Sequence, residues 1–268
     1  MTVLSMNDTL KNLEISYSRF NAQRTLSSSS ESRFYLDHIG GLTLLIDEAR
    51  SYDNRLLGVC ESNIDAVPAA LQKFSSLGLR PRIDLEPEAL TTKTAKTLNQ
   101  HGYFPTTSLV FLAMNNTHQD PFCPSPKTDF PSDVRVEIVP HARVDTFLDL
   151  LKKLVGLTCD EELWLKRKHL YCTQQFVCFV AYVDGEPCAC ATLFVEGALG
   201  VLANAVTLDS YRGRGCQRAL LEARIEHAHS RGIQCTMSDV LPNTTSQRNC
   251  QRVGFMPINT RSLWEYVA

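Results

Sequence analysis

The residues with the clearest chemical pattern lie in one short segment, Arg212-Gly213-Arg214-Gly215-Cys216-Gln217. A strand-like run ends just before this segment, and a helix-like pattern starts within it. Glycines let the backbone approach a ligand closely. The first N–H groups of a helix have no partner inside the helix, and the helix dipole favours an anion beside them. Because Arg212, Arg214 and Arg218 add positive charge, the pattern predicts a binding site for a diphosphate.

Two common phosphate motifs do not fit this segment. A P-loop requires GxxxxGK[ST], and no Lys-Ser or Lys-Thr pair follows Gly215. A dinucleotide fingerprint requires three glycines, and Arg218 stands at the third position. The alternative is a glycine turn before an exposed, arginine-rich helix. The hairpin-linked strands before the segment and the strand after the helix favour the binding loop.

The segment resembles the acetyl-CoA pyrophosphate loop, (Q/R)xxGx(G/A), of the GNAT N-acetyltransferase superfamily. Asn243 and Ser246 in the next helix, the helix end Val253-Gly254-Phe255 and the order of the elements agree with this resemblance. It covers about residues 133–268. A narrower resemblance to a tandem GNAT subgroup, whose N-terminal half is degenerate, is carried by Leu77–Arg82, Thr245–Asn249, Arg252–Phe255, Asn259-Thr260-Arg261 and Trp264.

The resemblance implies an acetyl-CoA-dependent N-acetyltransferase that needs no metal. In that family an amine attacks the thioester directly in a ternary complex, so catalysis depends on positioning and on backbone N–H groups that polarise the carbonyl. Acetyl-CoA is then a co-substrate, and the acceptor is a small-molecule or peptide amine. The residues that the resemblance assigns to acetyl-CoA are Val206, Thr207, Arg212, Gly213, Arg214, Gly215, Cys216, Gln217, Arg218, Asn243 and Ser246.

Gln217 and Cys250 differ from the family pattern, and the pattern does not identify the catalytic base. Gln217 replaces the Gly or Ala that ends the loop; its side chain either crowds the diphosphate or points away, and the narrower subgroup favours the second. Cys250 stands where many members place a tyrosine as general acid. A thiol can donate a proton, but a packed structural cysteine is the favoured reading. The strand before the loop carries no carboxylate, so Glu196, in the preceding turn, is the candidate base; the alternative is a solvated turn residue.

The C-terminal half predicts an α/β fold in which a mixed sheet carries helices on both faces. Its expected strands are 134–139, 176–183, 187–195, 199–208, 233–240 and 262–267, and its expected helices are 142–154, 159–171, 213–230 and 244–252. The N-terminal half echoes this order. Its expected strands are 42–46, 56–60, 82–85 and 107–114, and its expected helices are 64–77 and 87–100.

The similar order of elements in the two halves predicts an internal duplication. In both halves a helix ends at a glycine before the next strand, at His101-Gly102-Tyr103 and at Val253-Gly254-Phe255. The N-terminal copy reads Glu61-Ser62-Asn63-Ile64 at the loop position, with no glycine or arginine, so no cofactor is expected there. The proline-rich stretch Asn115–Asp133 separates the halves. We expect a degenerate GNAT-like domain at 1–114, a linker at 115–132 and a complete GNAT domain at 133–268.

Composition limits the remaining classes. Among 268 residues, 27 Lys and Arg balance 29 Asp and Glu, so a nucleic-acid partner is not expected. No apolar stretch is long enough to span a membrane and the N-terminus has no signal core, which predicts a cytoplasmic protein. Ten cysteines without a CxxC indicate reduced, packed thiols, and Cys188 with Cys190 on one strand face makes no metal site.

Two functions from different classes remain open at this point. The first is the N-acetyltransferase, as a monomer or a homodimer. The second is a catalytically idle GNAT pair that senses acyl-CoA or binds proteins. The missing tyrosine and the missing strand carboxylate favour the second function. The glycine loop with Asn243 favours acetyl-CoA binding in both, and we favour the enzyme.

Overall fold

The computed structural model describes residues 6–27, 31–50, 53–116 and 133–268, so residues 117–132 of the expected linker lie outside the described residues. The N-terminal half contains α1 (Met6–Arg24), β1 (Phe34–Ile39), β2 (Leu42–Asp47), β3 (Arg55–Leu57), α2 (Val67–Ser76), β4 (Arg82–Leu85), α3 (Thr92–Gln100) and β5 (Tyr103–Asn115). The C-terminal half contains β6 (Val134–Ile138), α4 (Val144–Val155), α5 (Glu161–Arg167), β7 (Phe176–Val183), β8 (Glu186–Glu196), β9 (Leu199–Thr207), α6 (Cys216–Ser230), β10 (Cys235–Val240), α7 (Thr245–Arg252) and β11 (Met256–Tyr266).

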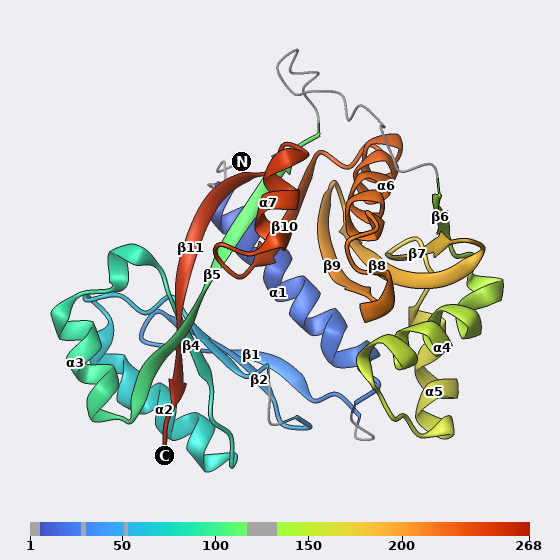
Figure 1. The fold of residues 1–268 in the computed structure, drawn as a ribbon. Helices are drawn as coiled ribbons and strands as arrows, with labels where there is room; N and C mark the ends of the chain where they lie inside the picture. Colours follow the sequence, from blue (N-terminus) through green and yellow to red (C-terminus); the bar gives the residue numbers. More distant parts are fainter. Residues whose placement is uncertain (1–5, 28–30, 51–52, 117–132) are drawn as a thin grey trace.

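All of these strands join one mixed sheet of 11 strands (Figure 1). Their order is β1-β2-β3-β4-β11-β5-β10-β9-β8-β7-β6. The two halves exchange strands at the centre, because β11 of the C-terminal half lies between β4 and β5, while β5 lies between β11 and β10. Each half therefore supplies one strand to the middle of the other.

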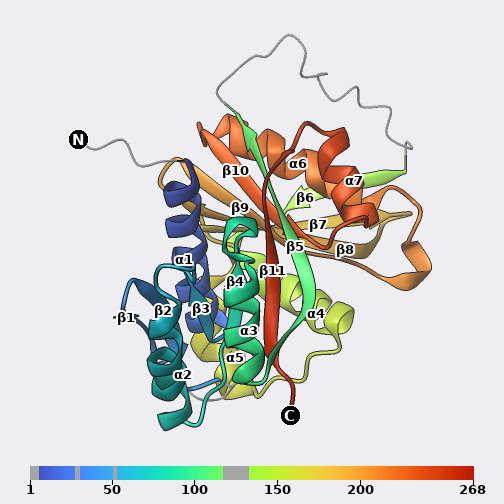
Figure 2. The same ribbon diagram turned by 90° about the vertical axis from the view of Figure 1, so that its left-hand side faces the viewer.

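Helices cover both faces of the C-terminal part of the sheet (Figure 2). On one face α6 and α7 bury an apolar cluster that includes Leu220, Cys250 and Phe255. On the other face α1, α4 and α5 bury a second cluster, to which α1 contributes Leu10, Leu13 and Phe20. The helix at the start of the chain thus packs on the sheet of the C-terminal half. No helix in the described ranges is long and apolar enough to cross a membrane.

The two halves share a helix cap, a glycine with positive φ and a parallel strand pair at corresponding places. Thr91 and Thr244 each cap a helix by accepting a hydrogen bond from the backbone N–H three residues later. Both helices are followed by a glycine with positive φ, Gly102 at 79° and Gly254 at 105°, and then by the exchanged strand. In both halves the strand before the capped helix pairs in parallel with the strand before it, β4 with β3 and β10 with β9.

Most expected elements are present, with shifted ends. The helix expected from Gly213 begins at Cys216, because Gly213 and Gly215 have φ of 79° and 85°, outside the helical region. The helix expected over 159–171 spans only Glu161–Arg167 and continues as a 3-10 turn. The sequence analysis missed α1 and β1 and shortened β11, which starts at Met256.

One expectation about the cysteines is wrong. Cys188 and Cys190 do not share a face, because the register between β7 and β8 shifts at this point and inserts an extra residue. Cys188 lies 3.6 Å from the Cys216 sulfur under α6, whereas Cys190 belongs to the opposite core. The nine described cysteines are all free, and seven of them are buried.

Candidate functional site

The sheet opens between β9 and β10. These parallel strands pair only at Leu199 with Cys235, Gly200 with Thr236 and Val201 with Met237. Beyond Val201 and Met237 the two strands diverge, and we call this opening the fork. Within the described residues β9 has no strand partner on its fork side from Leu202 onward, apart from the Ser238 hydroxyl, which donates to the Leu202 carbonyl at 3.2 Å. Backbone groups of β9 therefore face the fork and are available to a ligand.

A β-bulge interrupts β9 inside the fork. Cys190 pairs with Val206 and Thr192 pairs with Ala203, so Asn204 and Ala205 lie opposite the single residue Ala191. Asn204 has a φ of 49°, in the left-handed region that asparagine tolerates better than most residues. Bulges of this kind redirect backbone groups next to active sites.

Three side chains hold the bulge in place. The Asn204 amide donates to the Thr192 hydroxyl and to the Tyr17 hydroxyl, each at 3.2 Å. The Thr192 hydroxyl in turn donates to the Ala203 carbonyl at 3.1 Å. From the opposite face Arg224 Nη1 donates to the carbonyls of Thr192 and Ala203, at 3.3 and 3.4 Å. The backbone around Asn204 is thereby fixed from both faces of the sheet.

Arg224 is a buried cation that the sequence analysis missed. It is only 4% exposed, and its guanidinium contacts backbone carbonyls, including Leu220 O at 3.0 Å; no carboxylate in the described residues pairs with it. Burial lowers the pKa of Arg224 to about 10. The signal in the sequence is an arginine in the apolar stripe of a helix, four residues after Leu220 and four before Ala228.

The glycine loop connects the end of β9 to α6. Gly215 is the N-cap of α6 and no side chain caps this helix. The first N–H groups of α6 are therefore open to an anion. A Cβ on Gly213 would meet no atom within 4 Å, so it is the positive φ that favours glycine there. Loop and helix start together place a positive helix end beside the fork.

All three arginines of the loop region have carboxylate partners. Arg212 binds Asp209 at 2.8 Å and Arg218 binds Glu222 at 2.8 Å. Arg214 donates to Asp133 and Asp184, at 3.0 Å each, and these ion pairs raise the pKa of its guanidinium. The local excess of positive charge is thus smaller than the sequence suggests, which leaves the backbone N–H groups as the main anion donors.

The other expected acetyl-CoA residues surround the fork. Gln217 turns its side chain toward the strand and donates to the Thr207 hydroxyl at 2.7 Å, while Val206 is half-buried in the same strand. Asn243 and Ser246 are exposed at the start of α7, after β10. Asn243 has a φ of 61°, and its backbone N–H donates to the Gln247 side chain at 2.7 Å.

The two expected proton-transfer residues lie in different surroundings. Cys250 is buried beneath α7, and this burial raises the pKa of its thiol. Glu196 is exposed, pairs with Leu199 and accepts a hydrogen bond from Ser16 at 3.4 Å. Glu196 lies beside the first residue of β9, whereas Thr207 is the last, which is about 26 Å of extended strand away.

A carboxylate at the fork itself is Asp239 of β10. It follows Met237 on the same face of the strand and lies beyond the last residue that pairs with β9. Desolvation and the nearby Glu14 carboxylate raise the pKa of Asp239. Asp239 was not among the expected base candidates, because the family pattern pointed to β9. The missed signal is a single acidic residue in the otherwise uncharged strand Cys235–Val240.

Comparison with known proteins adds a family match. The profile of the family described as "Acetyltransferase (GNAT) family" matches residues 146–255. The match covers less than half of the chain and shows that residues 146–255 are similar to this family. The matched region contains the fork, the bulge and the glycine loop. The comparison with curated proteins gave no match.

Solved structures agree with the family match and extend over most of the chain. A GCN5-related N-acetyltransferase from Kribbella flavida has a TM-score of 0.62 at 16% identity and covers 95% of each chain. One from Sphaerobacter thermophilus has a TM-score of 0.61 at 15% identity and covers 84% of this chain and 80% of that one. A tandem GNAT protein from the clavulanic acid biosynthesis pathway has a TM-score of 0.58 at 12% identity, covering 86% and 80%. The fold is a mixed α/β sheet of two GNAT-like halves in tandem.

The corresponding fork of the N-terminal half is filled with charge pairs. Its cavity, of about 290 Å³, lies at the ends of β3 and β4 and is lined by Glu14, Asp84, Glu86 and Arg261, among others. Arg261 donates to Glu14 and Glu86 at 2.7 Å each, and Arg55 binds both Glu14 and Asp84. Carboxylates at this fork oppose the entry of an anion.

The corresponding loop of the N-terminal half is closed by the side chain of Asn63. The Asn63 side chain accepts from the Cys60 backbone N–H and donates to the Gly58 carbonyl, at 2.8 and 2.9 Å. In the described part of the chain no three His, Cys, Asp or Glu side chains gather as a metal site would require.

Proposed function

We propose that this protein transfers an acetyl group from acetyl-CoA to a primary amine, by direct attack within a ternary complex. The observation that carries the proposal is the fork between β9 and β10, where β9 leads into a glycine loop at the start of α6. The match of residues 146–255 to the acetyltransferase family supports the same activity. An acetyltransferase with these parts binds the diphosphate at the helix start and the thioester in the fork.

The loop and β9 hold and orient the co-substrate in this proposal. The N–H groups at Cys216, Gln217 and Arg218 bind the diphosphate, with the helix dipole adding to their attraction. The backbone at Val206 and Thr207 binds the pantetheine, and the bulge directs N–H groups at the thioester carbonyl. Asn243 and Ser246 border the other side of the fork.

Asp239 is the residue that we propose as the base. It takes one proton from the acceptor ammonium, directly or through water, so that the neutral amine attacks the carbonyl carbon. The C–N bond forms, the C–S bond breaks, and the remaining extra proton of the amide nitrogen passes, directly or through a proton donor, to the leaving CoA thiolate. A raised pKa brings this carboxyl group closer to neutral pH, where a base is effective. Glu196 is the competing candidate. Cys250 is favoured as a packed structural cysteine, and proton donation to the leaving thiolate is the alternative role for it.

We further propose that the chain arose by duplication and that only its C-terminal copy binds acetyl-CoA. The domains would be 1–114 and 133–268, joined by the linker 115–132. The repeated caps, glycines and parallel strand pairs support the duplication. The carboxylates of the N-terminal fork and its side-chain-closed loop support a single binding site.

Calorimetric titration and a thiol-release assay test the proposal together. Titration with acetyl-CoA is expected to give about one site per chain. Release of free thiol from acetyl-CoA is expected in the presence of an accepted amine and not without it. Binding of acetyl-CoA with no thiol release across a broad panel of amines would favour the acyl-CoA-sensing function instead. Two comparable sites per chain would contradict the degenerate N-terminal copy.

A further inference from the structure

A second cavity, of about 330 Å³, lies against the bulge on the face covered by α1 and α4. Asn204, the residue with the positive φ, is part of its lining. The end of α1 contributes Asn21 and Arg24, the segment between β2 and β3 contributes Arg50 and Asp53, and apolar side chains form another part of the wall. These apolar side chains are Leu26, Leu151, Val155 and Leu157. The cavity volume is suited to a small molecule rather than to a protein segment.

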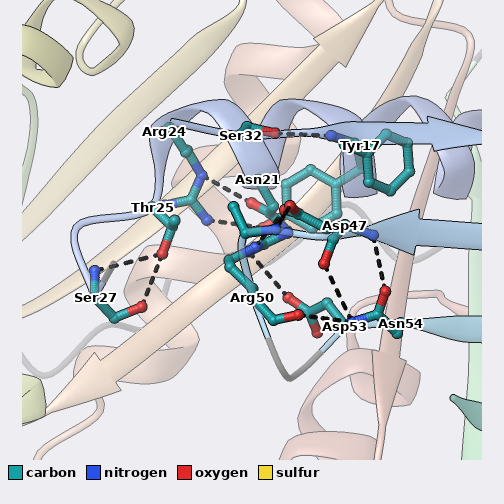
Figure 3. A network of polar contacts seen from close by, with 12 residues as sticks. Tyr17, Asn21, Arg24, Thr25, Ser27, Ser32, Asp47, Arg50, Asp53 and Asn54 are labelled. Carbon is teal, nitrogen blue, oxygen red and sulfur yellow. Dashed lines mark hydrogen bonds and ion pairs between the residues drawn. The ribbon is translucent and has the colours of Figure 1, made fainter. Parts of the chain in front are cut away.

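Arg24 is the charged group of this cavity that no carboxylate neutralises within the described residues. Figure 3 shows it at the end of α1 beside Asn21, with Asp47, Arg50 and Asp53 next to it. Arg50, which is ion-paired to Asp47 and Asp53, also lines the cavity together with Asp53. Arg24 Nε donates to Asn21 Oδ1 at 2.8 Å. Its two terminal nitrogens donate to phenol oxygens, Nη1 to Tyr171 at 3.2 Å and Nη2 to Tyr17 at 3.5 Å.

These contacts leave Arg24 with two further N–H donors. A guanidinium carries five N–H groups, and the three contacts use three of them, one on each nitrogen. The remaining two N–H groups belong to Nη1 and Nη2, and each can donate a charge-assisted hydrogen bond to a carboxylate oxygen. The rings of Phe176 and Tyr171 lie 4.5 and 5.6 Å from the guanidinium carbon and fix its plane.

The position of Arg24 relative to the bulge sets the size of the ligand. One phenol oxygen, that of Tyr17, lies 3.5 Å from Arg24 Nη2 and 3.2 Å from Asn204 Nδ2. The guanidinium is thus separated from the bulge by a single hydroxyl group. A molecule that binds Arg24 through a carboxylate has room for only a few bonds before its next polar group reaches the bulge.

We propose that this cavity binds the acetyl acceptor and that the acceptor is a free amino acid with an apolar side chain. Arg24 binds its carboxylate, the leucine-lined wall receives its side chain, and its amine lies at the bulge. This inference rests on the proposed acetyl transfer, because the amine must face the thioester held in the fork. The chemistry is unchanged: the amine nitrogen bonds to the acetyl carbon, one proton goes to the base, and the CoA thiolate leaves.

Matched pairs of amines give the sharpest test. L-Leucine and L-leucinamide share the amine and the side chain, but only L-leucine carries a negative charge. We expect kcat/KM from thiol release to be at least about 30-fold higher for L-leucine. Arg24→Gln is expected to lower the value for L-leucine at least about 30-fold and to leave that for L-leucinamide within about threefold. Arg24→Lys is expected to retain part of the preference.

The matched control is Arg19→Gln, an exposed arginine on the same helix that lies outside the cavity. It is expected to keep the wild-type preference. Titration of Arg24→Gln with acetyl-CoA checks that the fork remains intact. If Arg24→Gln does not fold, the wild-type comparison of acid and amide, together with Arg24→Lys, decides the question.

The outcomes separate this inference from the proposed function. Equal rates with L-leucine and L-leucinamide, or an unchanged preference in Arg24→Gln, overturn the amino-acid assignment. Thiol release with spermidine but with neither leucine probe overturns it too, while acetyl transfer stands. A protein that does not bind acetyl-CoA at all removes the basis of both proposals.

Discussion

Arg224 Nη1 donates a hydrogen bond to the carbonyl of Ala203, the last residue of β9 that pairs with β8 before the bulge. This contact connects the helix that follows the glycine loop to the strand that faces the fork. A movement of α6 is therefore transmitted to the backbone groups that would polarise the thioester. The arrangement leads to a first prediction, in which stability and activity respond differently.

Arg224→Met is expected to change the free energy of unfolding by less than about 1.5 kcal/mol, because replacing a buried charge with an apolar side chain of similar size is often neutral or stabilising. The Ala203 carbonyl keeps its hydrogen bond from Thr192. The kcat of acetyl transfer is expected to fall at least about tenfold, because the bulge loses its support from α6. Thermal melts and steady-state kinetics on the same preparation check both parts. A loss of stability with unchanged kcat would show that Arg224 is only structural.

Gly215→Glu is expected to weaken acetyl-CoA binding by at least about 3 kcal/mol, more than a hundredfold. The substitution adds a negative charge beside the diphosphate and a side chain to a residue at φ 85°. Gly215→Ala isolates the backbone effect, for which a left-handed conformation costs about 1–2 kcal/mol. Calorimetric titration of both variants measures the difference. Wild-type affinity in Gly215→Glu would refute the diphosphate loop and the acetyltransferase proposal with it.

Asp239→Asn is expected to lower kcat at least about a hundredfold if Asp239 is the base. In the wild type, activity should fall as the pH drops through the raised pKa of Asp239, because the base acts as the carboxylate. Asp239→Asn should remove this acidic limb from the pH profile. Glu196→Gln, measured in parallel, decides between the two carboxylates.

The raised pKa of Asp239 also affects how the free energy of unfolding depends on pH. Because its pKa is raised in the folded state, the fold binds its proton more tightly than the unfolded chain does. The contribution of this group to stability is present at low pH and is lost as pH rises from the unfolded pKa through the folded one. Because the Asp239 side chain is exposed and solvent screens its interactions, Asp239→Asn is expected to stabilise the protein only slightly at neutral pH, in contrast to its effect on activity. Urea unfolding at pH 7 measures the sign.

Cys250→Ala is expected to leave kcat within about tenfold of the wild type, a change in barrier below about 1.4 kcal/mol. The thiol is buried and its pKa is raised, so we expect it to act mainly in packing. The same variant should lose about 1–2 kcal/mol of stability by leaving a small cavity. A fall in kcat of two orders of magnitude, with folding intact, would make Cys250 the proton donor.

The glycine loop and the alternation of strands and helices could be predicted because they depend on local pattern. Arg212–Gln217 combines turn glycines with a helix start, and the structure places the first helical residue at Cys216. The helix α1 was also within reach, since Leu10, Leu13, Tyr17 and Phe20 follow helical spacing. The polar residues Asn7, Asp8, Lys11 and Glu14 in this stretch argue against a signal peptide, but they are equally compatible with an amphipathic helix.

Other features depend on residues that are far apart in the chain. The residues near Asn204 do not predict a bulge. The bulge depends on the pairing register between β9 and β8 and on contacts with Tyr17 and Arg224. In the sequence, Arg24 is an ordinary basic residue at the end of a helix. Only the folded structure places Tyr171 and Asn204 next to it. The likeness of the two halves was visible, but their exchange of strands was not, since pairing partners cannot be read from one strand alone.

The interleaving of β11 and β5 makes the two halves partners that are joined like the subunits of a strand-swapped dimer. A gene truncated to residues 133–268 would encode β11 without either of the strands that flank it, β4 and β5. We therefore expect that neither half folds stably without the other. Co-expression of residues 1–116 and 133–268 as separate polypeptides should instead reconstitute the sheet as a heterodimer. The covalent connection would thus serve to keep the two partners at equal stoichiometry and high local concentration.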